Sequence, residues 1–423
     1  MSKLEELIEQ YCPDGVEWHP FFDVCDLIRG ITYNKEQEAK TQADDAYKVL
    51  RANNITLHLN ILNFEDVKLV SKDVMVKPTQ HLFAGDILMC AGSGSKEHVG
   101  KVAFIPENMD YTFGGFMAVV RCKDAILPRF VYHILTSGYF SNHLDVQINS
   151  STINNINKQV MQSFEIPVPP LPVQEEIVRI LDAFTELQAE LQAELQKRKQ
   201  QYNYYLDNLL NFKNINRGGY QAEVRWMKLK DVATQWYRGA GIKREEVRED
   251  GMPCIRYGEI HTTYNIWFDD CISHTDESKQ VSRKYAEKGD ILFAITSEDI
   301  PFVGNSVAYL GDERILVGGD IVVMKHNQDP KYMAYALSTS DAIKQKGKGK
   351  VKSKVVHTNV PSLQEIVIPI PSMTEQKRIA SILDRFDTLT TDLTQGLPAE
   401  IEKRRQQYEY YRDKLLTFKR KGA

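Results

Sequence analysis

The sequence lacks any apolar run long enough to cross a membrane, because no stretch approaches the roughly 18–20 hydrophobic residues that a spanning helix needs. Its first residues, MSKLEELIEQYCPDG, are acidic where a secretion signal would be basic and then apolar. We therefore expect a cytoplasmic protein without membrane contacts.

Cysteine is scarce, with six residues scattered singly and no CxxC pair among 423 positions. Structural zinc sites use closely spaced ligands, and small secreted scaffolds use dense cysteines for disulfides. The spacing indicates neither, so we expect reduced, mostly structural thiols and no bound metal.

Neither sign of charge dominates, since 53 lysines and arginines face 57 acidic residues for a net charge of -4. Nucleic-acid binding would therefore have to rest on local patches. The composition, 42% hydrophobic and 26% charged, is that of an ordinary globular protein, and the length suits roughly two to three domains.

Complete catalytic motifs are also missing. Residues 94–101 resemble a phosphate-binding loop, but the glycine spacing is one residue too long and Val102 replaces the hydroxyl residue that would hold magnesium. Residues 299–302 resemble the Asp-Pro-Pro-aromatic signature of amino-methyltransferases, but Ile300 replaces the first proline. The ten histidines form no HExxH or nucleophile pattern. We expect no self-sufficient active site, although a site assembled only in three dimensions stays open.

An internal repeat organises the chain. IPVP at 166–169 and IPIP at 368–371 begin two runs that match at an offset of 202 residues, and the tails at 197–212 and 403–418 match at 206. Fainter matches upstream include the Gly-Asp-Ile-Leu runs at 85 and 289 and the Gly-Gly pairs at 114 and 318. A period of about 200 residues excludes solenoid repeats and predicts a duplicated unit of globular domain plus helix.

The better-matched part of each half predicts a long helix. Residues 174–212 contain neither glycine nor proline and follow three prolines, so one helix of ~60 Å is expected there. Its apolar seam repeats every seven residues, which predicts pairing with the second copy. Gly396 and Pro398 predict a kink or short break in that copy, where four more residues are present. The expected seam is Ile177, Leu181, Phe184, Leu191, Leu195, Tyr202, Leu209, Ile379, Leu383, Phe386, Leu393, Tyr408 and Leu415.

Three tandem tetrapeptides, TELQ followed by two AELQ, occupy residues 185–196 of the first helix. The bland interpretation of both helices is a plain coiled-coil spacer. The remaining segments mix short β-type runs, turns and short helices, which indicates α+β domains. The division predicted is a globular domain at 1–165, a helix region at 166–219, a second domain at 220–367 and a second helix region at 368–423.

Some residues have the chemistry to contact DNA. The segment 344–354 holds six lysines, which suits phosphates, although a solvated loop is an equal alternative. The counterpart at 150–158 is rich in amides, which can read adenine, and matched arginines follow short apolar strands, where arginine can read guanine or form a structural ion pair. The candidates are Arg51, Asn53, Asn54, Asn154, Asn155, Lys158, Arg256, Tyr257, Lys348, Lys350, Lys352 and Lys354.

Five sequence features together resemble the specificity subunits of type I restriction-modification systems. They are LEELIEQYCPDGVEW near the start, the duplicated IPVPPLPVQEEIVRILDAF and IPIPSMTEQKRIASILDRF, the tails KRKQQYNYYLDNLL and KRRQQYEYYRDKLL, GLPAEIE, and the paired Gly-Asp-Ile-Leu runs. The resemblance covers essentially the whole chain.

The resemblance implies an α+β fold with two mixed α/β target recognition domains, separated by two long helices that form an antiparallel coiled coil with pseudo-twofold symmetry. Each domain would read one half of a split site in double-stranded DNA, and the helices would set the spacer and dock two modification subunits. In that family the chain binds no cofactor: modification subunits use S-adenosylmethionine to methylate adenine N6, and restriction subunits use ATP and magnesium.

Alternatives remain at this point. One is a variant that serves methylation only or is silent. Another is a coiled-coil scaffold whose domains do not read DNA, and a third is an enzyme that acts alone.

Overall fold

The computed structural model describes residues 2–39, 46–57, 60–148, 155–212, 224–350, 354–391 and 396–422. Two compact units are present, one formed by Met1–Leu191 with Ile401–Ala423 and the other by Gln192–Glu400. Helix α6 (Leu171–Asn211) begins in the first unit and ends in the second. The long helix predicted from the sequence is therefore present.

Among its described residues, the first unit has two four-stranded sheets and a small two-stranded one. The central sheet has the order β2 (Cys25–Arg29), β9 (Met117–Cys122), β6 (Ile87–Cys90), β7 (Val102–Phe104). The outer sheet has the order β4 (Lys68–Ser71), β3 (Ala46–Leu50), β8 (Met109–Phe113), β5 (His81–Leu82), and β1 (Trp18–Pro20) pairs with β10 (Glu165–Pro167).

Short helices complete the first unit. They are α1 (Lys3–Tyr11), α2 (Phe21–Val24), α3 (Pro128–Leu135), α4 (Gly138–Ile148), α5 (Lys158–Gln162), the 3-10 turns η1 (Lys35–Gln37), η2 (Ala52–Asn54), η3 (Pro78–Gln80) and η4 (Lys96–His98), and α13 (Leu397–Leu415), which lies almost wholly in this unit.

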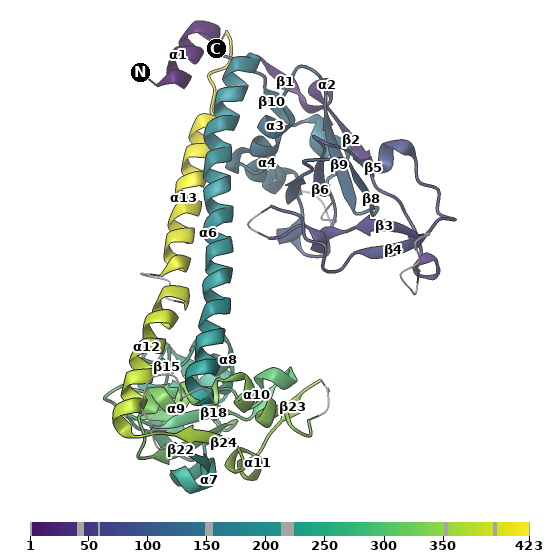
Figure 1. Cartoon of the computed structure of the whole chain (residues 1–423). Coiled ribbons are helices and arrows are strands. Elements are labelled where there is room, and N and C mark those ends of the chain that lie inside the picture. Colours follow the sequence, from purple (N-terminus) through teal and green to yellow (C-terminus); the bar gives the residue numbers. More distant parts are fainter. Residues whose placement is uncertain are drawn as a thin grey trace. The chain divides into compact units, whose positions relative to one another are not determined.

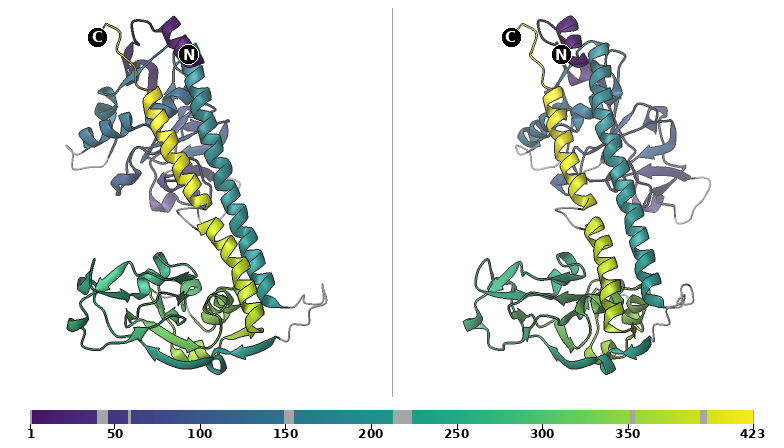
Figure 2. Two further views of the ribbon diagram at one scale, coloured as in Figure 1. Left: turned by 90° about the vertical axis from the view of Figure 1, so that its left-hand side faces the viewer. Right: turned by 60° about the vertical axis from the view of Figure 1, so that its left-hand side comes forward.

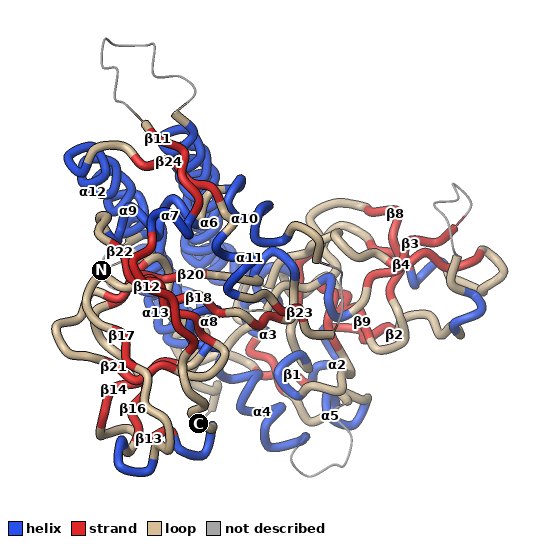
Figure 3. Tube along the Cα trace, turned by 90° about the horizontal axis from the view of Figure 1, so that it is seen from below, coloured by secondary structure: helices blue, strands red, loops and turns tan. Residues whose placement is uncertain are grey.

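The second unit repeats this plan with extra edge strands. Its central sheet is β12 (Ala233–Arg238), β22 (Ile321–His326), β18 (Ile291–Ala294), β20 (Ser306–Tyr309), β15 (Trp267–Phe268). Its outer sheet is β13 (Val247–Arg248), β16 (Ser273–Thr275), β14 (Met252–Ile255), β21 (Ile315–Val317), β17 (Tyr285–Ala286), seen in Figure 3. β11 (Arg225–Lys228) pairs with β24 (Val367–Ile370), and β19 (Thr296–Ser297) with β23 (Val356–His357).

The helices of the second unit are again mostly short. They are α7 (Leu229–Val232), α8 (Tyr257–Thr262), α9 (Pro330–Leu337), α10 (Ser340–Gly347), α11 (Val360–Gln364), α12 (Met373–Thr391), and the turns η5 (Arg244–Glu246), η6 (Glu277–Lys279) and η7 (Ile300–Phe302).

The repeated Gly-Asp-Ile-Leu runs lead into a strand of each unit whose residues are all buried, β6 and β18. In β6, Ile87 and Met89 join the core against the helices, whereas Leu88 and Cys90 join the core between the two sheets. In β18, Ile291 and Phe293 likewise join the core against the helices, whereas Leu292 and Ala294 join the core between the two sheets. Side chains alternate between the faces of a strand, so a strand covered on both faces must be apolar throughout. The β6 and β18 runs meet that demand.

The two units share one topology. The order β2-β9-β6-β7 recurs as β12-β22-β18-β20, and the parallel pair β3·β8 recurs as β14·β21. The predicted α+β fold class and its internal duplication are confirmed.

Each unit is fastened to its helices by equivalent side chains. In the first, the buried Gln174 accepts a hydrogen bond from the Leu127 backbone at 2.8 Å, and Asp182 binds His133 at 2.8 Å. In the second, the buried Gln376 accepts one from the Asp329 backbone at 3.0 Å, and Asp384 binds Tyr335 at 2.7 Å. Residues that match at the repeat offset of 202 therefore share their tertiary contacts as well as their identity.

A second fastening comes from the helix of the opposite repeat. In the first unit, Asp413 of α13 accepts a hydrogen bond from the Gly138 backbone at 3.1 Å. In the second unit, Asp207 of α6 accepts hydrogen bonds from the backbone and hydroxyl of Ser340 at 2.8 and 2.6 Å. Each globular part therefore rests on one helix from each repeat.

The helices pair antiparallel within both units. In the first unit, Phe184 of α6 stacks on Tyr411 of α13, with ring centroids 5.6 Å apart; in the second, Tyr205 of α6 stacks on Phe386 of α12 at 5.2 Å. Numbers rise along α6 while they fall along its partners, and Figures 1 and 2 show α6 beside α13 and beside α12.

The expected seam residues occupy several environments. Ile177, Leu181, Leu195, Ile379, Leu383 and Tyr408 are buried; Phe184, Leu191, Tyr202, Leu209, Phe386 and Leu415 are partly buried; Leu393 lies outside the described residues. The sequence reasoning missed Leu206 and Leu210, which are buried in the core of the second unit. They follow Tyr202 at the 3.6-residue period of a helix packed on a domain, not at the heptad period.

Three further expectations concern single features. Gly396 is not helical and separates α12 from α13, as its glycine and the following proline indicated. All six cysteines are free thiols, and five of them are buried. Among the described residues, no helix is long and apolar enough to cross a membrane.

Candidate nucleic-acid interface

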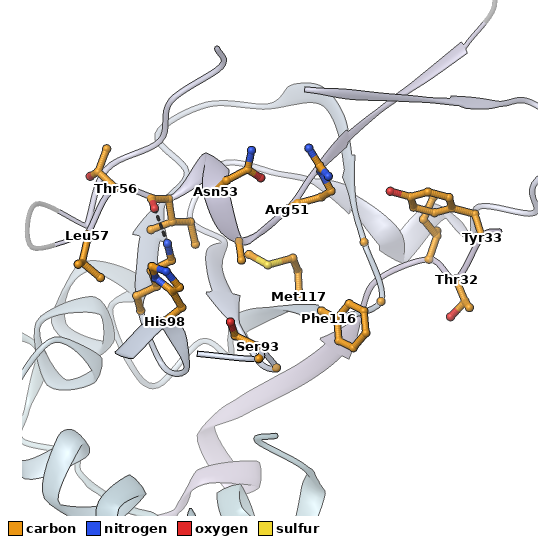
Figure 4. A pocket seen from close by; sticks show the side chains of 18 residues that line it. Thr32, Tyr33, Arg51, Asn53, Thr56, Leu57, Ser93, His98, Phe116 and Met117 are labelled. Atoms are coloured by element: carbon orange, nitrogen blue, oxygen red, sulfur yellow. Dashed lines mark hydrogen bonds between the residues drawn. The ribbon is translucent and has the colours of Figure 1, made fainter. Parts of the chain in front are cut away.

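A cavity of about 1010 Å³, the first cavity, opens in the first unit where strands β3 and β8 end. These strands are parallel neighbours, with Leu50 opposite Phe113, so the segments that follow them lie at the same edge. After β3 the chain turns through Arg51 into η2, and after β8 it turns through Gly114 and Gly115. Arg51 and Asn53 lie on one side of the cavity, with Ser93 and Phe116 on the other (Figure 4).

Hydrogen bonds position the polar groups of the first cavity. Arg51 forms an ion pair with Asp66 at 2.7 Å, and the Asn53 amide donates to the same carboxylate at 2.9 Å. Lys101 donates to the Ile55 carbonyl at 2.7 Å. Arg51 thus has the structural ion pair that was one of its two interpretations, yet it still lines the cavity.

Asn54 is a correction to the predicted set. Its side chain is fully buried, its amide donates to the carbonyls of Asn63 and Asp66, and its oxygen accepts from the Arg51 backbone. A side chain so enclosed stabilises the turn after β3 and has no access to DNA.

The second unit has a smaller cavity of about 460 Å³ at the equivalent place, the second cavity. Arg256 and Tyr257 follow β14 and line it together with Gly318 and Gly319, which follow β21. The structure thus brings Arg51 and Arg256, matched by the repeat, to the same position in the two domains.

Glycine is required directly after β2 and β12, the strands beside the Gly-Gly turns. A Cβ atom at Gly30 would lie 2.2 Å from the Phe113 carbonyl oxygen, and one at Gly239 would lie 2.2 Å from that of Gly318. No side chain fits so close an approach. The two glycines therefore shape the two cavities in the same way.

The cavities differ in what lies beside the Gly-Gly turn. The first has Phe116, which is 74% exposed. The second has Asp320, which forms an ion pair at 2.8 Å with Arg238. The arginine equivalent to Arg238, Arg29, binds the side chain of Asn155 at 2.9 Å. The sequence reasoning noted both Gly-Gly pairs but missed these neighbours.

The amide-rich segment of the first unit is only partly described. Asn155 is exposed and holds Arg29, and Lys158 is exposed at the start of α5. Asn154 lies outside the described residues. Asn155 and Lys158 remain candidates for contacting DNA.

The lysine-rich segment is only partly a loop. Its first four residues, 344–347, end helix α10. Lys348 and Lys354 are exposed and Lys350 is partly exposed, while Lys352 lies outside the described residues. Lys346 points inward and is only 5% exposed, with its amine 3.2 Å from the Ser306 hydroxyl.

Lys346→Met is expected to stabilise the second unit at pH 7 by roughly 4–5 kcal/mol, from 1.36 kcal/mol per pKa unit. Burial lowers the pKa of Lys346 to about 7, against 10.5 for an ordinary lysine. Between these values the unfolded chain binds more protons, so the wild-type unfolding free energy rises with pH across this window. Urea unfolding at pH 7 and 10 measures both effects. Lys348→Met, at an exposed lysine, is the control, and an Lys346→Met protein that keeps the wild-type pH slope would refute the assignment.

No cluster of histidine, cysteine or acidic side chains suited to a metal ion occurs in the part of the chain that the structure describes. The loop that resembles a phosphate-binding motif contains only the 3-10 turn η4, not the start of an α-helix. The residues offer recognition chemistry, namely cations, amides and aromatic rings beside two concave sites.

Sequence comparison finds one family across both halves of the chain. The family model described as the type I restriction modification DNA specificity domain matches residues 13–201 and 221–403. The EcoR124I/EcoR124II type I restriction enzyme specificity subunit of Escherichia coli is 35% identical over 312 residues, which cover 71% of this chain and 73% of that protein. A putative type I restriction enzyme specificity subunit of Haemophilus influenzae is 29% identical over 430 residues, covering 98% of each chain.

Structure comparison finds the same fold in a chain from a solved structure concerning complex assembly and conformational transition of the type I R-M system. The TM-score is 0.61, with 14% sequence identity, and the match covers 96% of this chain and 98% of the other. At this level of identity the likeness concerns the fold alone.

Proposed function

This chain belongs to the family of DNA specificity subunits of type I restriction-modification systems, and we propose that its two domains each read one half of a bipartite, asymmetric DNA site. As a specificity subunit it provides DNA sequence recognition and is not a catalytic subunit. The recognition domains proposed are residues 1–165 and 220–367, with helix regions at 166–219 and 368–423.

One observation supports two reading sites above all others. Both domains have a cavity at the same edge, each with an arginine at its rim and a Gly-Gly turn beside it. Arginine can bind guanine through two hydrogen bonds, and amides such as Asn53 can bind adenine in the same way. Because the neighbouring residues differ between the cavities, we infer that the two half-sites differ in sequence.

The remaining candidates fit contacts to the DNA backbone. Exposed lysines such as Lys158, Lys348 and Lys354 neutralise phosphates without reading sequence, which positions the protein on the duplex. Lys350 belongs to the same group, and Asn155 joins the base-reading candidates. The base-reading set is therefore Arg51, Asn53 and Asn155 in the first domain and Arg256 with Tyr257 in the second.

The helices are proposed to fix the number of unspecified base pairs between the half-sites and to dock two modification subunits. Those subunits would methylate adenine N6 with S-adenosylmethionine, and restriction subunits would use ATP and magnesium. A variant that serves methylation only, or that is silent, has the same architecture, so the test must read the DNA itself.

The test is adenine-methylation mapping of genomic DNA from cells that carry this chain with its modification subunit, compared with cells from which the chain is deleted. The proposal expects one bipartite motif that occurs only when the chain is present. Identical methylation in both strains would indicate a silent variant or a scaffold and would contradict the reading role.

Lys348→Ala combined with Lys350→Ala is expected to weaken binding to every DNA sequence alike. Removing one lysine from a phosphate should flatten the slope of log K against log salt by about 0.9, so the double change should flatten it by roughly 2. Titrating specific and unrelated duplexes over a range of salt measures this slope. The double arginine variant keeps both charges and should keep the slope, and an unchanged slope in the alanine variant would mark the segment as a solvated loop.

A further inference from the structure

The rim of the first cavity presents an aromatic ring that the fold holds in place but does not cover. Phe116 lies in the turn between β8 and β9 and is 74% exposed. Its carbonyl accepts hydrogen bonds from the backbones of Ala91 and Gly92, both at 2.9 Å, and its ring packs over Gly92, where a Cβ would come within 3.3 Å. The fold thus holds the backbone that carries the ring, while most of the ring surface stays open to a ligand.

The cavity beside this ring has unused hydrogen-bonding capacity. Arg51 Nε and His98 Nδ1 are buried atoms without a hydrogen-bond partner within the described residues, and both side chains line the cavity (Figure 4). Buried Met117 and Ile55 contribute apolar surface. A flat ring with polar edges, such as a nucleobase, is complementary to this combination.

We propose that the first recognition domain removes one base of its half-site from the duplex stack, with Phe116 occupying the vacated place and the first cavity accepting the base. This inference rests on the proposed function. Apolar side chains inserted between base steps unstack DNA, and extruded bases are bound by stacking and edge hydrogen bonds. Protein sites for small organic molecules span roughly 300–1,000 Å³, so the cavity of about 1010 Å³ has room for a nucleotide.

The second domain has no aromatic ring at the equivalent Gly-Gly turn, because its Tyr257 lies on the other chain segment that lines the cavity, after β14. At the place of Phe116 it has Asp320, a carboxylate that neither stacks on bases nor approaches phosphates favourably, and that is paired with Arg238. Its cavity has less than half the volume, about 460 Å³. The unstacked base is therefore confined to the half-site of the first domain.

The test uses the full chain assembled with its modification subunits on a duplex that carries the mapped bipartite site. Every position of both half-sites is probed in turn: 2-aminopurine replaces adenine, permanganate reports thymine, and pyrrolocytosine reports the loss of pairing at guanine and cytosine. Methyltransferases extrude the base that they modify, so the target adenine of each half-site is expected to be unstacked in every variant. Beyond these adenines we expect one further unstacked position, in the first half-site only, for the wild type and for Phe116→Trp. Phe116→Ala should lose that signal and bind the specific duplex about 5- to 150-fold more weakly, the effect of removing one base-stacking side chain.

Met75→Ala is the matched control, because Met75 is an 84% exposed apolar side chain of the same domain away from the cavity. It should change neither signal nor affinity, and melting temperatures should be equal for all variants.

If the wild type binds its bipartite site but unstacks no base of the first half-site other than the target adenine, the inference is overturned and the proposed function stands. If the further unstacked position persists in Phe116→Ala, the inference is also overturned. A wild-type complex with no preference for the bipartite site would overturn both.

Discussion

Inserting one further AELQ tetrapeptide after Gln196 is expected to lengthen the unspecified spacer of the methylated site by one or two base pairs, while both half-site sequences stay the same. Four residues add ~6 Å of helix and turn it ~40° beyond a full turn. In B-DNA a rise of ~3.4 Å accompanies each base pair, and one turn takes about 10 base pairs. The added rise thus equals roughly two base pairs and the added rotation roughly one.

The effect would be close to all-or-none, because sites with the original spacer should lose methylation and sites with the longer spacer should gain it. Methylation mapping of the two strains measures both changes. The same tetrapeptide inserted at Glu107, in the loop between β7 and β8, is the control for a four-residue insertion and should leave the spacer unaltered. An unchanged spacer after the helix insertion would contradict the proposal that the length of α6 sets the distance between the half-sites.

Arg256→Ala is expected to abolish the preference for one base pair of the second half-site, at a cost of about 1–3 kcal/mol or roughly 5- to 150-fold in discrimination. The Arg256 guanidinium lines the second cavity and forms no ion pair within the described residues. Because it forms no such pair, its side chain is more available for a base edge than that of Arg51, which is paired with Asp66.

Competition binding with all single-base substitutions of the second half-site measures this preference. Arg248→Ala, which removes an exposed arginine of the same domain outside the cavity, should leave the motif unchanged. A motif that also survives Arg256→Ala, together with a lower unfolding free energy, would identify Arg256 as a structural residue.

The overall plan was predictable because it is encoded in long-range repetition and in helix-breaking residues. The IPVP and IPIP runs, the glycine-free stretch before Phe212 and the break at Gly396 all fixed elements that the structure contains. The shared arginine positions were also visible, since the repeat aligns residue 51 with residue 256. These signals can be recognised in the sequence without any knowledge of tertiary contacts.

The site itself was less predictable, because accessibility depends on which way a side chain points. Asn54 and Lys346 are residue types that often contact DNA, yet tertiary packing buries both. Phe116 is a residue type that is usually buried in a core, yet its side chain is exposed to water in this turn. Sequence pattern indicated the chemistry of these residues, and only the fold determined which of them a ligand could reach.

The contacts of Asp413 and Asp207 bear on how such a chain could have arisen. Since each globular part needs a helix from the opposite repeat, the product of a gene encoding residues 1–212 alone would miss α13. The tail of its own α6, which carries Asp207, would be free to make in a second molecule the contact that Asp413 makes here. Two such molecules would complete each other, so sedimentation should show a homodimer. Such a dimer would favour a palindrome. Gene fusion followed by divergence of the two halves would then convert a protein that recognises a palindromic site into one that recognises two different half-sites.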